Sequence, residues 1–311
     1  MVNPIDNNQE YDRAKEVKEF DDSKIGVKGL IDSGINSIPK FFIHPPETLA
    51  DFKSNLSTVT IPVIDLSSPT IVDEIRTAAK TFGFFQIINH GIEISLLDKT
   101  LSAIKSFNEL ETEEKKKYYR RDGGNGFTFS TNVDLFVSKA ASWRDTVQIR
   151  LGPVPVEPER IPEVMRSEVV EINGEIKRLG EKLMGLLAEG LGVGAERFNE
   201  MSCVEGRLMV GHYYPYCPQA DLTVGINSHT DPGVLTVLME NEVGGLQIKH
   251  GDGWVDVKPI RGGLVINVGD ILQILSNDEY KSVEHRVLAN SYQEPRLSAA
   301  VFFNVECASI T

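Results

Sequence analysis

The feature that most constrains the fold of this chain is a change in hydrophobic period at Arg207. From there on, apolar residues recur in short runs with a period of two, separated by Gly and Pro, which is typical of β-strands. These runs cover residues 208–214, 225–229, 234–239, 246–250, 254–257, 264–268, 283–288 and 297–303. So many short strands at close spacing predict a sandwich or a barrel for this part of the chain.

The first half of the chain predicts a mixture of strands and helices. In chain order, the expected strand and helix segments cover residues 61–66, 71–82, 84–88, 93–110, 127–136 and 143–151. Thr70 and Asp73 have the spacing of a capping box at the start of the first of these helices. A longer helix over 167–191 carries apolar residues at spacings of three and four, so we expect it to pack on a sheet.

Composition and charge argue against several classes of protein. The chain has 311 residues, of which 41% are hydrophobic, and can bury a sizeable core. Its net charge of −13 argues against nucleic acid and anionic membranes as partners, because both attract basic surfaces. We expect no membrane span, because no stretch of about eighteen apolar residues exists. The three cysteines predict a reducing compartment, and the charged N-terminus is unlike a secretory signal, so the expected location is the cytosol.

A short motif at the end of one predicted strand carries candidate metal ligands. His229 and Asp231 are two residues apart, so an imidazole and a carboxylate would project from the same face of a strand. Such a pair alone is more typical of local hydrogen bonding, but His285 offers a second imidazole from a later strand-like run. Two His and one carboxylate make the facial triad of non-haem Fe(II) oxygenases. Zinc takes the same ligands, so a Zn(II) hydrolase is an alternative.

A second group of residues suits an acidic ligand. Arg296 and Ser298 are also two residues apart, and they offer a planar fork and a hydroxyl to a carboxylate. Upstream, Tyr214 lies in the run Tyr-Tyr-Pro-Tyr-Cys-Pro and can give a second hydroxyl to the same acid. These residues predict an anchor for an acidic cosubstrate.

Together these motifs resemble those of the plant 2-oxoglutarate- and Fe(II)-dependent dioxygenases. The matching elements, in the family's order, are Tyr-Tyr-Pro-x-Cys-Pro (213–218), His-x-Asp (229–231), Asn-x-Gly-Asp (267–270), Ser-Asn-x-x-Tyr-Lys-Ser-Val-x-His-Arg-Val (276–287) and Arg-x-Ser (296–298). The resemblance runs from about Tyr11 to the last residues. Within the family, the chain is most similar to the 1-aminocyclopropane-1-carboxylate oxidase homologues, which include hydroxylases such as deacetoxyvindoline 4-hydroxylase.

The resemblance implies an α+β fold, in which a double-stranded β-helix, or jelly roll, is flanked by helices. It implies a helix and strand region over residues 1–165 and an Fe(II)/2-oxoglutarate jelly-roll domain over 166–311. Relatives continue with a segment that covers the substrate mouth, and this chain has a short C-terminus. We therefore expect it to bind metal and cosubstrate better than it couples oxidation to a substrate, because such sites need to exclude water.

The resemblance also implies roles for the site residues. The assigned residues are His229, Asp231 and His285 for Fe(II), Tyr214, Arg296 and Ser298 for 2-oxoglutarate, and Thr146, Val210 and Phe302 for the substrate. No catalytic residue is expected beyond the metal ligands. His212, near the predicted cosubstrate Tyr, suits either a contact with the cosubstrate or a packing role.

The implied reaction is the oxidation of a small specialised metabolite, most simply its hydroxylation. O₂ would be the oxidant, ascorbate the reductant, and 2-oxoglutarate would be converted to succinate and CO₂. An ascorbate-dependent oxidase, which shares the Arg-x-Ser motif, is one alternative that the sequence leaves open. A catalytically silent, metal-binding relative is another. The sequence does not name the substrate, choose between hydroxylation, desaturation and demethylation, or give the oligomeric state.

Overall fold

The computed structural model describes residues 11–52, 59–124 and 126–305, so residues 306–311, on which the expectation of a short C-terminus falls, lie outside the described residues. The strands are β1 (Val63–Asp65), β2 (Phe84–Ile88), β3 (Phe127–Thr131), β4 (Asp145–Gly152), β5 (Gly206–Tyr214), β6 (Val224–His229), β7 (Leu235–Glu240), β8 (Leu246–His250), β9 (Gly253–Asp256), β10 (Leu264–Val268), β11 (His285–Leu288) and β12 (Arg296–Asn304). The α-helices are α1 (Arg13–Ser23), α2 (Gly26–Asp32), α3 (Pro46–Phe52), α4 (Ile71–Thr81), α5 (Ile94–Asn108), α6 (Thr112–Lys116), α7 (Glu163–Gly190), α8 (Arg197–Glu200) and α9 (Asp270–Leu275). In this described part, every helix is too short or too polar to cross a membrane.

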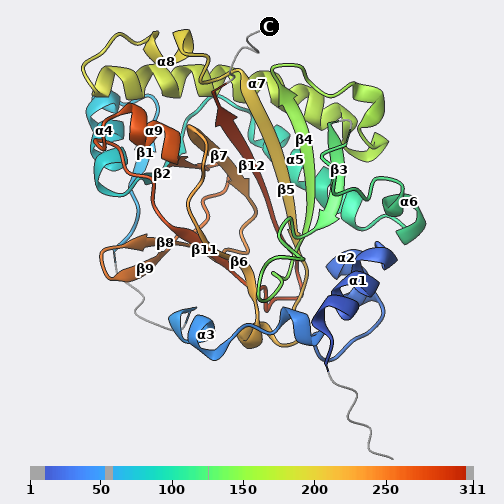
Figure 1. Ribbon diagram of the computed structural model, residues 1–311. Helices are drawn as coiled ribbons and strands as arrows, with labels where there is room; N and C mark the ends of the chain where they lie inside the picture. The colour runs from blue at the N-terminus through green and yellow to red at the C-terminus, as the bar shows by residue number, and fades with distance from the viewer. Residues whose placement is uncertain (1–10, 53–58, 125, 306–311) are drawn as a thin grey trace, which may run out of the picture.

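Two β-sheets form the core of the molecule (Figure 1). The larger sheet has eight strands in the order β1-β2-β10-β7-β12-β5-β4-β3, and the smaller has four in the order β6-β11-β8-β9. The paired strands are antiparallel except for β1 with β2. From β5 to β12 the chain passes back and forth between the two sheets, which is the connectivity of a jelly roll. The predicted fold class is therefore confirmed.

Strands from the first half of the chain extend the larger sheet at both of its edges. β4 pairs with β5 on one side, and β2 pairs with β10 on the other. The two halves of the chain thus share one sheet. The division into regions 1–165 and 166–311 stays a prediction.

Helices cover one face of the larger sheet in two layers (Figure 1). Helix α5 contacts β5, β7 and β12, helix α4 contacts β2, and α7 packs against both of these helices. The apolar stripe predicted for α7 is buried, although the helix begins four residues earlier than expected, directly after Pro162. Gly180 allows α7 to approach the sheet closely, because a Cβ there would lie 2.3 Å from the ring of Phe303. The long helix is therefore a structural element, as predicted.

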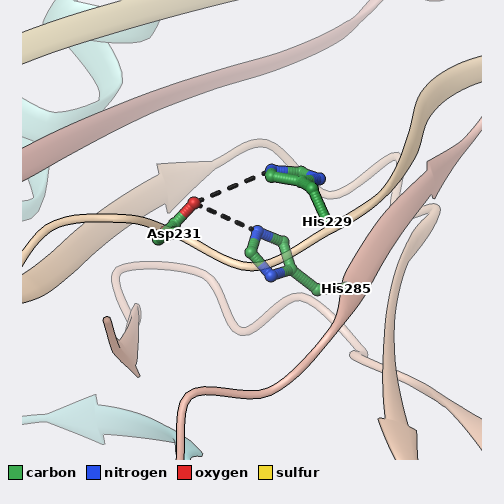
Figure 2. A group of neighbouring side chains, drawn as sticks. All are labelled: His229, Asp231 and His285. Carbon is green, nitrogen blue, oxygen red and sulfur yellow. Dashed lines mark ion pairs between the residues drawn. The ribbon is translucent and has the colours of Figure 1, made fainter. Parts of the chain in front are cut away.

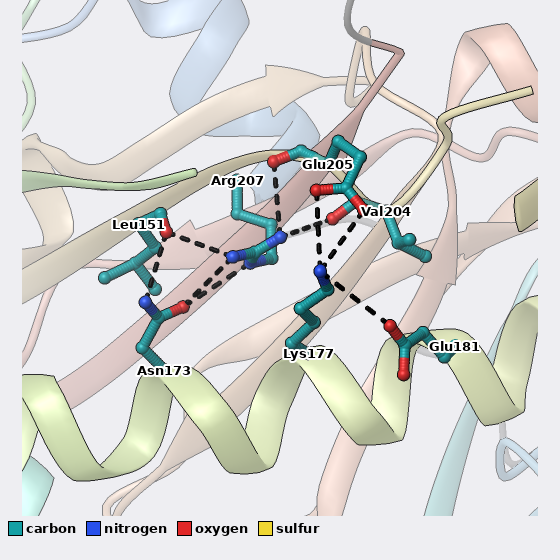
Figure 3. A network of polar contacts seen from close by, with 7 residues as sticks. All are labelled: Leu151, Asn173, Lys177, Glu181, Val204, Glu205 and Arg207. Carbon is teal, nitrogen blue, oxygen red and sulfur yellow. Dashed lines mark hydrogen bonds and ion pairs between the residues drawn. The ribbon is translucent and has the colours of Figure 1, made fainter. Parts of the chain in front are cut away.

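A buried polar network joins α7 to the start of β5 (Figure 3). Its centre is Arg207, which is 6% exposed. The guanidinium donates to the carbonyl oxygens of Val204 at 2.6 Å and Leu151 at 3.1 Å. It also approaches Oδ1 of Asn173 on α7 at 3.4 Å, and the amide of Asn173 donates to the same Leu151 carbonyl at 3.1 Å. These contacts fix the helix against the sheet and satisfy the buried cation.

Candidate metal centre

His229, Asp231 and His285 converge in a small cavity between the two sheets (Figure 2). His229 ends β6 and His285 begins β11, and the register of these strands places the two His opposite each other. Asp231 lies just beyond β6 rather than on the strand, but its side chain still turns to the imidazoles. Its Oδ1 is 3.7 Å from Nε2 of His229 and 3.6 Å from Nε2 of His285. One potential ligand atom from each residue lies within 4.8 Å of the others, which suits a single ion.

Hydrogen bonds hold both imidazoles in the orientation that a metal ligand needs. Nδ1 of His229 lies 2.9 Å from the carbonyl oxygen of Asn227, and Nδ1 of His285 lies 3.2 Å from that of Val283. A carbonyl can only accept, so each Nδ1 donates and each Nε2 keeps a free lone pair. Burial, and then the neighbouring His229, lowers the pKa of His285 to about 4. That imidazole is therefore neutral near pH 7, the form that binds a metal.

The second carboxylate oxygen of Asp231 is held by two side chains of the larger sheet. Thr236 on β7 donates to Oδ2 at 2.6 Å, and Asn267 on β10 donates to it at 2.8 Å. Oδ1 is thereby left facing the two imidazoles. Sequence reasoning assigned no role to either residue, although Asn267 lies in the Asn-x-Gly-Asp motif and Thr236 is a polar residue in an apolar strand. Both residues therefore orient the carboxylate of this candidate metal ligand.

The rest of that motif holds the loop in which Asp231 lies. The backbone N–H of Asp270 donates to the carbonyl of Asp231 at 2.8 Å. Gly269 permits this approach, because a Cβ at that position would lie 2.2 Å from the carbonyl oxygen of Gly233. The side chain of Asp270 also accepts a hydrogen bond from Thr230 at 3.2 Å. The glycine is therefore required for close contact between two loops.

Tyr214, Arg296 and Ser298 form a polar group in the same cavity as the metal ligands. Arg296 and Tyr214 pair across β12 and β5, and the guanidinium lies 4.8 Å from the centre of the Tyr214 ring. Nη1 of Arg296 donates to Oγ of Ser298 at 3.2 Å. Among the described residues, the hydroxyl of Tyr214 and Nε of Arg296 are buried without a partner. Unpaired buried polar atoms are uncommon, and here they lie where a ligand could use them.

A carboxylate that sequence reasoning missed contacts this group. Nη2 of Arg296 donates to Oε2 of Glu240 at 2.6 Å, and the two side chains are only 2% and 5% exposed. Burial raises the pKa of Glu240, and Arg296 lowers it. The sequence does contain a signal for this role. Glu240 follows Thr236 and Leu238 at a spacing of two, so its side chain lies on the same inward face of β7.

The three expected substrate residues have different surroundings. Phe302 lines the metal cavity, which has a volume of about 50 Å³. The hydroxyl of Thr146 lies 3.1 Å from Nδ1 of His212, which lines the cavity too. Val210 is buried on the same face of β5 but does not line the cavity. Burial, followed by the nearby Arg144, keeps the pKa of His212 well below its ordinary value, so this ring is neutral.

The donor set fits a divalent metal ion of the non-haem iron type. Two imidazole nitrogens and one carboxylate oxygen face a common point, and hydrogen bonds hold all three side chains. Such a set occupies one face of an ion and leaves the other positions free. A polar group suited to an anion lies beside it. The cavity thus combines a site for a metal with a site for an acidic ligand.

Comparison with known proteins gives two matching family models and several similar sequences. Residues 205–305 match the 2OG-Fe(II) oxygenase superfamily, and residues 61–167 match the model described as non-haem dioxygenase in morphine synthesis N-terminal. The chain is 46% identical over 295 residues to 1-aminocyclopropane-1-carboxylate oxidase homolog 4 of Arabidopsis thaliana, covering 94% of this chain and 84% of the relative. Homolog 1 of the same plant is 45% identical over 302 residues, covering 94% and 82%.

Solved structures with the same fold include a dioxygenase and a protein crystallised with 2-oxoglutarate and iron. The structure of JOX2 in complex with 2OG, Fe and JA matches with a TM-score of 0.80 and 31% identity, covering 90% of this chain and 83% of JOX2. The dioxygenase for auxin oxidation in rice matches with a TM-score of 0.66 and 25% identity, covering 80% of this chain and 86% of the rice protein.

Proposed function

Because this chain belongs to the 2OG-Fe(II) oxygenase superfamily, among the plant homologues of 1-aminocyclopropane-1-carboxylate oxidase, we propose that it hydroxylates a small specialised metabolite. It is an oxidoreductase of the 2-oxoglutarate-dependent dioxygenase class, which uses Fe(II) and 2-oxoglutarate. In the proposed reaction, O₂ is consumed, 2-oxoglutarate is converted to succinate and CO₂, and ascorbate keeps the metal reduced.

The observation that carries the proposal is the unpaired polar group beside the triad. A Zn(II) hydrolase would need the two His and the carboxylate, but it would have no use for an unpaired guanidinium Nε and an unpaired phenol hydroxyl, both buried beside the metal ligands. A five-carbon diacid has a use for both, because its keto acid end chelates a metal and its far carboxylate needs donors. Nε of Arg296 and the hydroxyl of Tyr214 can supply those donors.

We assign the metal to Nε2 of His229, Nε2 of His285 and Oδ1 of Asp231. When bound there, Fe(II) would bring the keto acid and O₂ together and supply the oxidising chemistry. Asp231 contributes the charged ligand, and Thr236 and Asn267 keep that carboxylate from rotating. The two imidazoles keep their orientation through their Nδ1 hydrogen bonds.

We assign the cosubstrate to Tyr214, Arg296 and Ser298, as the sequence motifs predict. These residues would bind and orient the diacid without exchanging a proton with it. Apolar side chains also line the cavity, among them Phe84, Leu246 and Val287. Those side chains would exclude water from the reacting atoms.

The proposed substrate class and compartment rest on separate observations. JOX2 was solved with the small molecule JA as well as with 2OG and Fe, which supports a small-molecule substrate for this chain. We propose Phe302, which lines the metal cavity, Thr146, which contacts His212 there, and Val210 as substrate contacts. We also propose the cytosol, because Cys203 and Cys217 are free and buried, as in proteins of a reducing compartment.

Mass spectrometry with a metabolite library tests the proposal. The full chain is incubated with Fe(II), ascorbate, O₂ and 2-oxoglutarate, and the expected result is a product that has gained one oxygen atom, together with succinate. The Asp231→Ala variant serves as the control and should form neither. Oxidation of a metabolite at the full rate without 2-oxoglutarate would show an ascorbate-dependent oxidase instead.

A further inference from the structure

A buried carboxylate already occupies the guanidinium that the proposed function assigns to the cosubstrate. Oε2 of Glu240 accepts a hydrogen bond from Nη2 of Arg296 at 2.6 Å, while Oε1 is buried with no partner among the described residues. Glu240 ends β7 and lies opposite Ser298 on β12, so the sheet itself fixes its position. The pair is therefore part of the jelly roll.

Arg296, which lines the metal cavity, is the charged group that acts on Glu240. Tyr214 on β5 also faces this pair, whereas the cation of Arg144, directly before β4, acts on Tyr214 and His212 instead. Glu240 also lines a groove of about 830 Å³ beside the cavity, and the other charged residues of that groove are Asp98 and Lys105 of α5, Glu242, Arg261 and Glu294. Among the described residues, Arg296 is the cation that pairs with the buried carboxylate of Glu240.

That arrangement has a consequence for any ligand with a second carboxylate. The Glu240–Arg296 pair has no net charge, so a diacid that places its far carboxylate on Arg296 adds one uncompensated negative charge to a buried site. Two carboxylates that share one cation in such surroundings do not both remain ionised, and one of them takes up a proton. The far carboxylate must also compete with Glu240 for the donors of one guanidinium.

We propose that Glu240 is a specificity-determining residue of the cosubstrate site, which competes with the far carboxylate of 2-oxoglutarate for Arg296 and takes up one proton when the diacid binds. This inference rests on the proposed function. In the free protein, Arg296 stabilises the ionised form of Glu240 against its burial. In the complex, Arg296 also binds the far carboxylate of the cosubstrate and stabilises the ionised form of Glu240 less. The neutral form of Glu240 is therefore favoured.

The direction of the pH effect follows from this exchange. The complex binds one proton more than the free protein, so the affinity for 2-oxoglutarate falls as the pH rises. The fall approaches tenfold per pH unit between the pKa of Glu240 in the free protein and its pKa in the complex. A 2-oxo acid of the same length with a neutral far end, such as the 5-amide of 2-oxoglutarate, brings no second charge and should show no such dependence.

Isothermal titration calorimetry of the Mn(II)-loaded full chain tests the inference through binding. 2-Oxoglutarate is titrated anaerobically in buffers with different heats of ionisation, which counts the protons taken up. The wild type should take up about one proton. The Glu240→Gln variant keeps an acceptor for Arg296 but loses the charge, so it should take up none and bind 2-oxoglutarate about tenfold more tightly at pH 7.5.

Two controls separate competition from a purely structural role. Glu242→Gln, an exposed change two residues away, should behave as the wild type, and the 5-amide should bind without proton uptake. If Glu240 only positions Arg296, Glu240→Gln will bind 2-oxoglutarate equally or more weakly with an unchanged proton count, which overturns the inference but leaves the proposed function intact. No proton uptake by the wild type overturns it as well, even if the variant fails to fold. No binding of 2-oxoglutarate by either protein at any pH rejects the proposed function and this inference together.

Discussion

Two buried arginines lie at opposite ends of the same strand pair and have opposite kinds of surroundings. On β5, Arg207 lies opposite Phe303 of β12, and Arg296 of β12 lies opposite Tyr214 of β5. Arg207 donates to backbone carbonyls and to Asn173, and this part of the described structure leaves none of its buried side-chain atoms without a partner (Figure 3). Around Arg296, three buried polar atoms are unpaired.

The difference teaches which buried charges serve the fold and which serve a ligand. A network in which every donor has an acceptor stabilises a single packing arrangement. A network with unpaired donors costs free energy in the unliganded protein, and a ligand that satisfies those donors recovers it. We therefore assign Arg207 to stability and Arg296 to binding. Each of the following changes should affect one of these properties and not the other.

The largest effect should come from Asp231→Ala, which removes the charged metal ligand. We expect the Fe(II) affinity to fall by more than about a hundredfold, because loss of a residue that merely orients a ligand already costs tenfold to a hundredfold. Titration with Fe(II) under anaerobic conditions measures this. Excess metal should raise the unfolding midpoint of the wild type but not that of the variant. The exposed Asp252→Ala change is the control. If Asp231→Ala binds iron as tightly as the wild type, the assignment of Asp231 as a metal ligand is wrong.

Arg207→Met should have the next largest effect, on stability alone. The change removes hydrogen bonds from a charged donor and leaves buried carbonyls unpaired, so we expect a loss of about 2–4 kcal/mol in the free energy of unfolding. Urea unfolding measures it, and the exposed Arg178→Met change on α7 is the matched control. The folded variant should bind Fe(II) and 2-oxoglutarate as the wild type does. A loss of cosubstrate affinity with no loss of stability would reverse the assignment.

Arg296→Lys should weaken 2-oxoglutarate binding and leave stability and iron binding intact. Lys keeps the charge but loses the planar fork. Loss of one good charged hydrogen bond costs about 1.5–3 kcal/mol, so the affinity should fall by about tenfold to a hundredfold. Calorimetric titration of the metal-loaded protein measures this, with the exposed Arg261→Lys change as control. Unchanged affinity would mean that the cosubstrate is held elsewhere.

The smallest effect should come from Thr236→Val, which removes one hydrogen bond from Asp231 without changing the charge of the site. We expect the Fe(II) affinity to fall by about tenfold, the lower end of what such orienting residues contribute. Thr100→Val is the matched control, because its hydroxyl is also buried and hydrogen-bonded, but within α5. Equal iron affinities for the two variants would show that the carboxylate needs no orientation from β7.

Local patterns predicted much of the secondary structure. The bounds of β8 and β10 agree with their predicted runs, because β8 alternates apolar and polar residues and β10 is mostly apolar and β-branched. The expected segment 127–136 is strand only to Thr131, because Asn132 takes a positive φ of 49° and binds the backbone of Ser142. The predicted capping box is wrong, since the hydroxyl of Thr70 donates to the carboxylate of Glu74 at 2.7 Å instead of the hydroxyl accepting from the backbone.

The candidate site could be predicted only as far as its motifs reach. His229, Asp231 and His285 come together as the spacing and the resemblance imply, although their roles stay a prediction. The contacts of Thr236 and Glu240 could not be foreseen. They depend on the pairing of β7 with β10 and β12, and the order of strands along the chain does not reveal which of them become neighbours in a sheet.

The central claim is that the Arg296 cavity binds 2-oxoglutarate for oxidation at the triad, and succinate formation tests it most directly. Isotope-labelled 2-oxoglutarate is added with O₂ and ascorbate to the Fe(II)-loaded wild type, Asp231→Ala and Arg207→Met, and labelled succinate is measured by mass spectrometry. We predict that the wild type forms more than one mole of succinate per mole of protein. Asp231→Ala should form none, and folded Arg207→Met should form as much as the wild type. Equal succinate formation by Asp231→Ala, or none by a wild type that oxidises a metabolite with ascorbate and O₂ alone, would contradict the account.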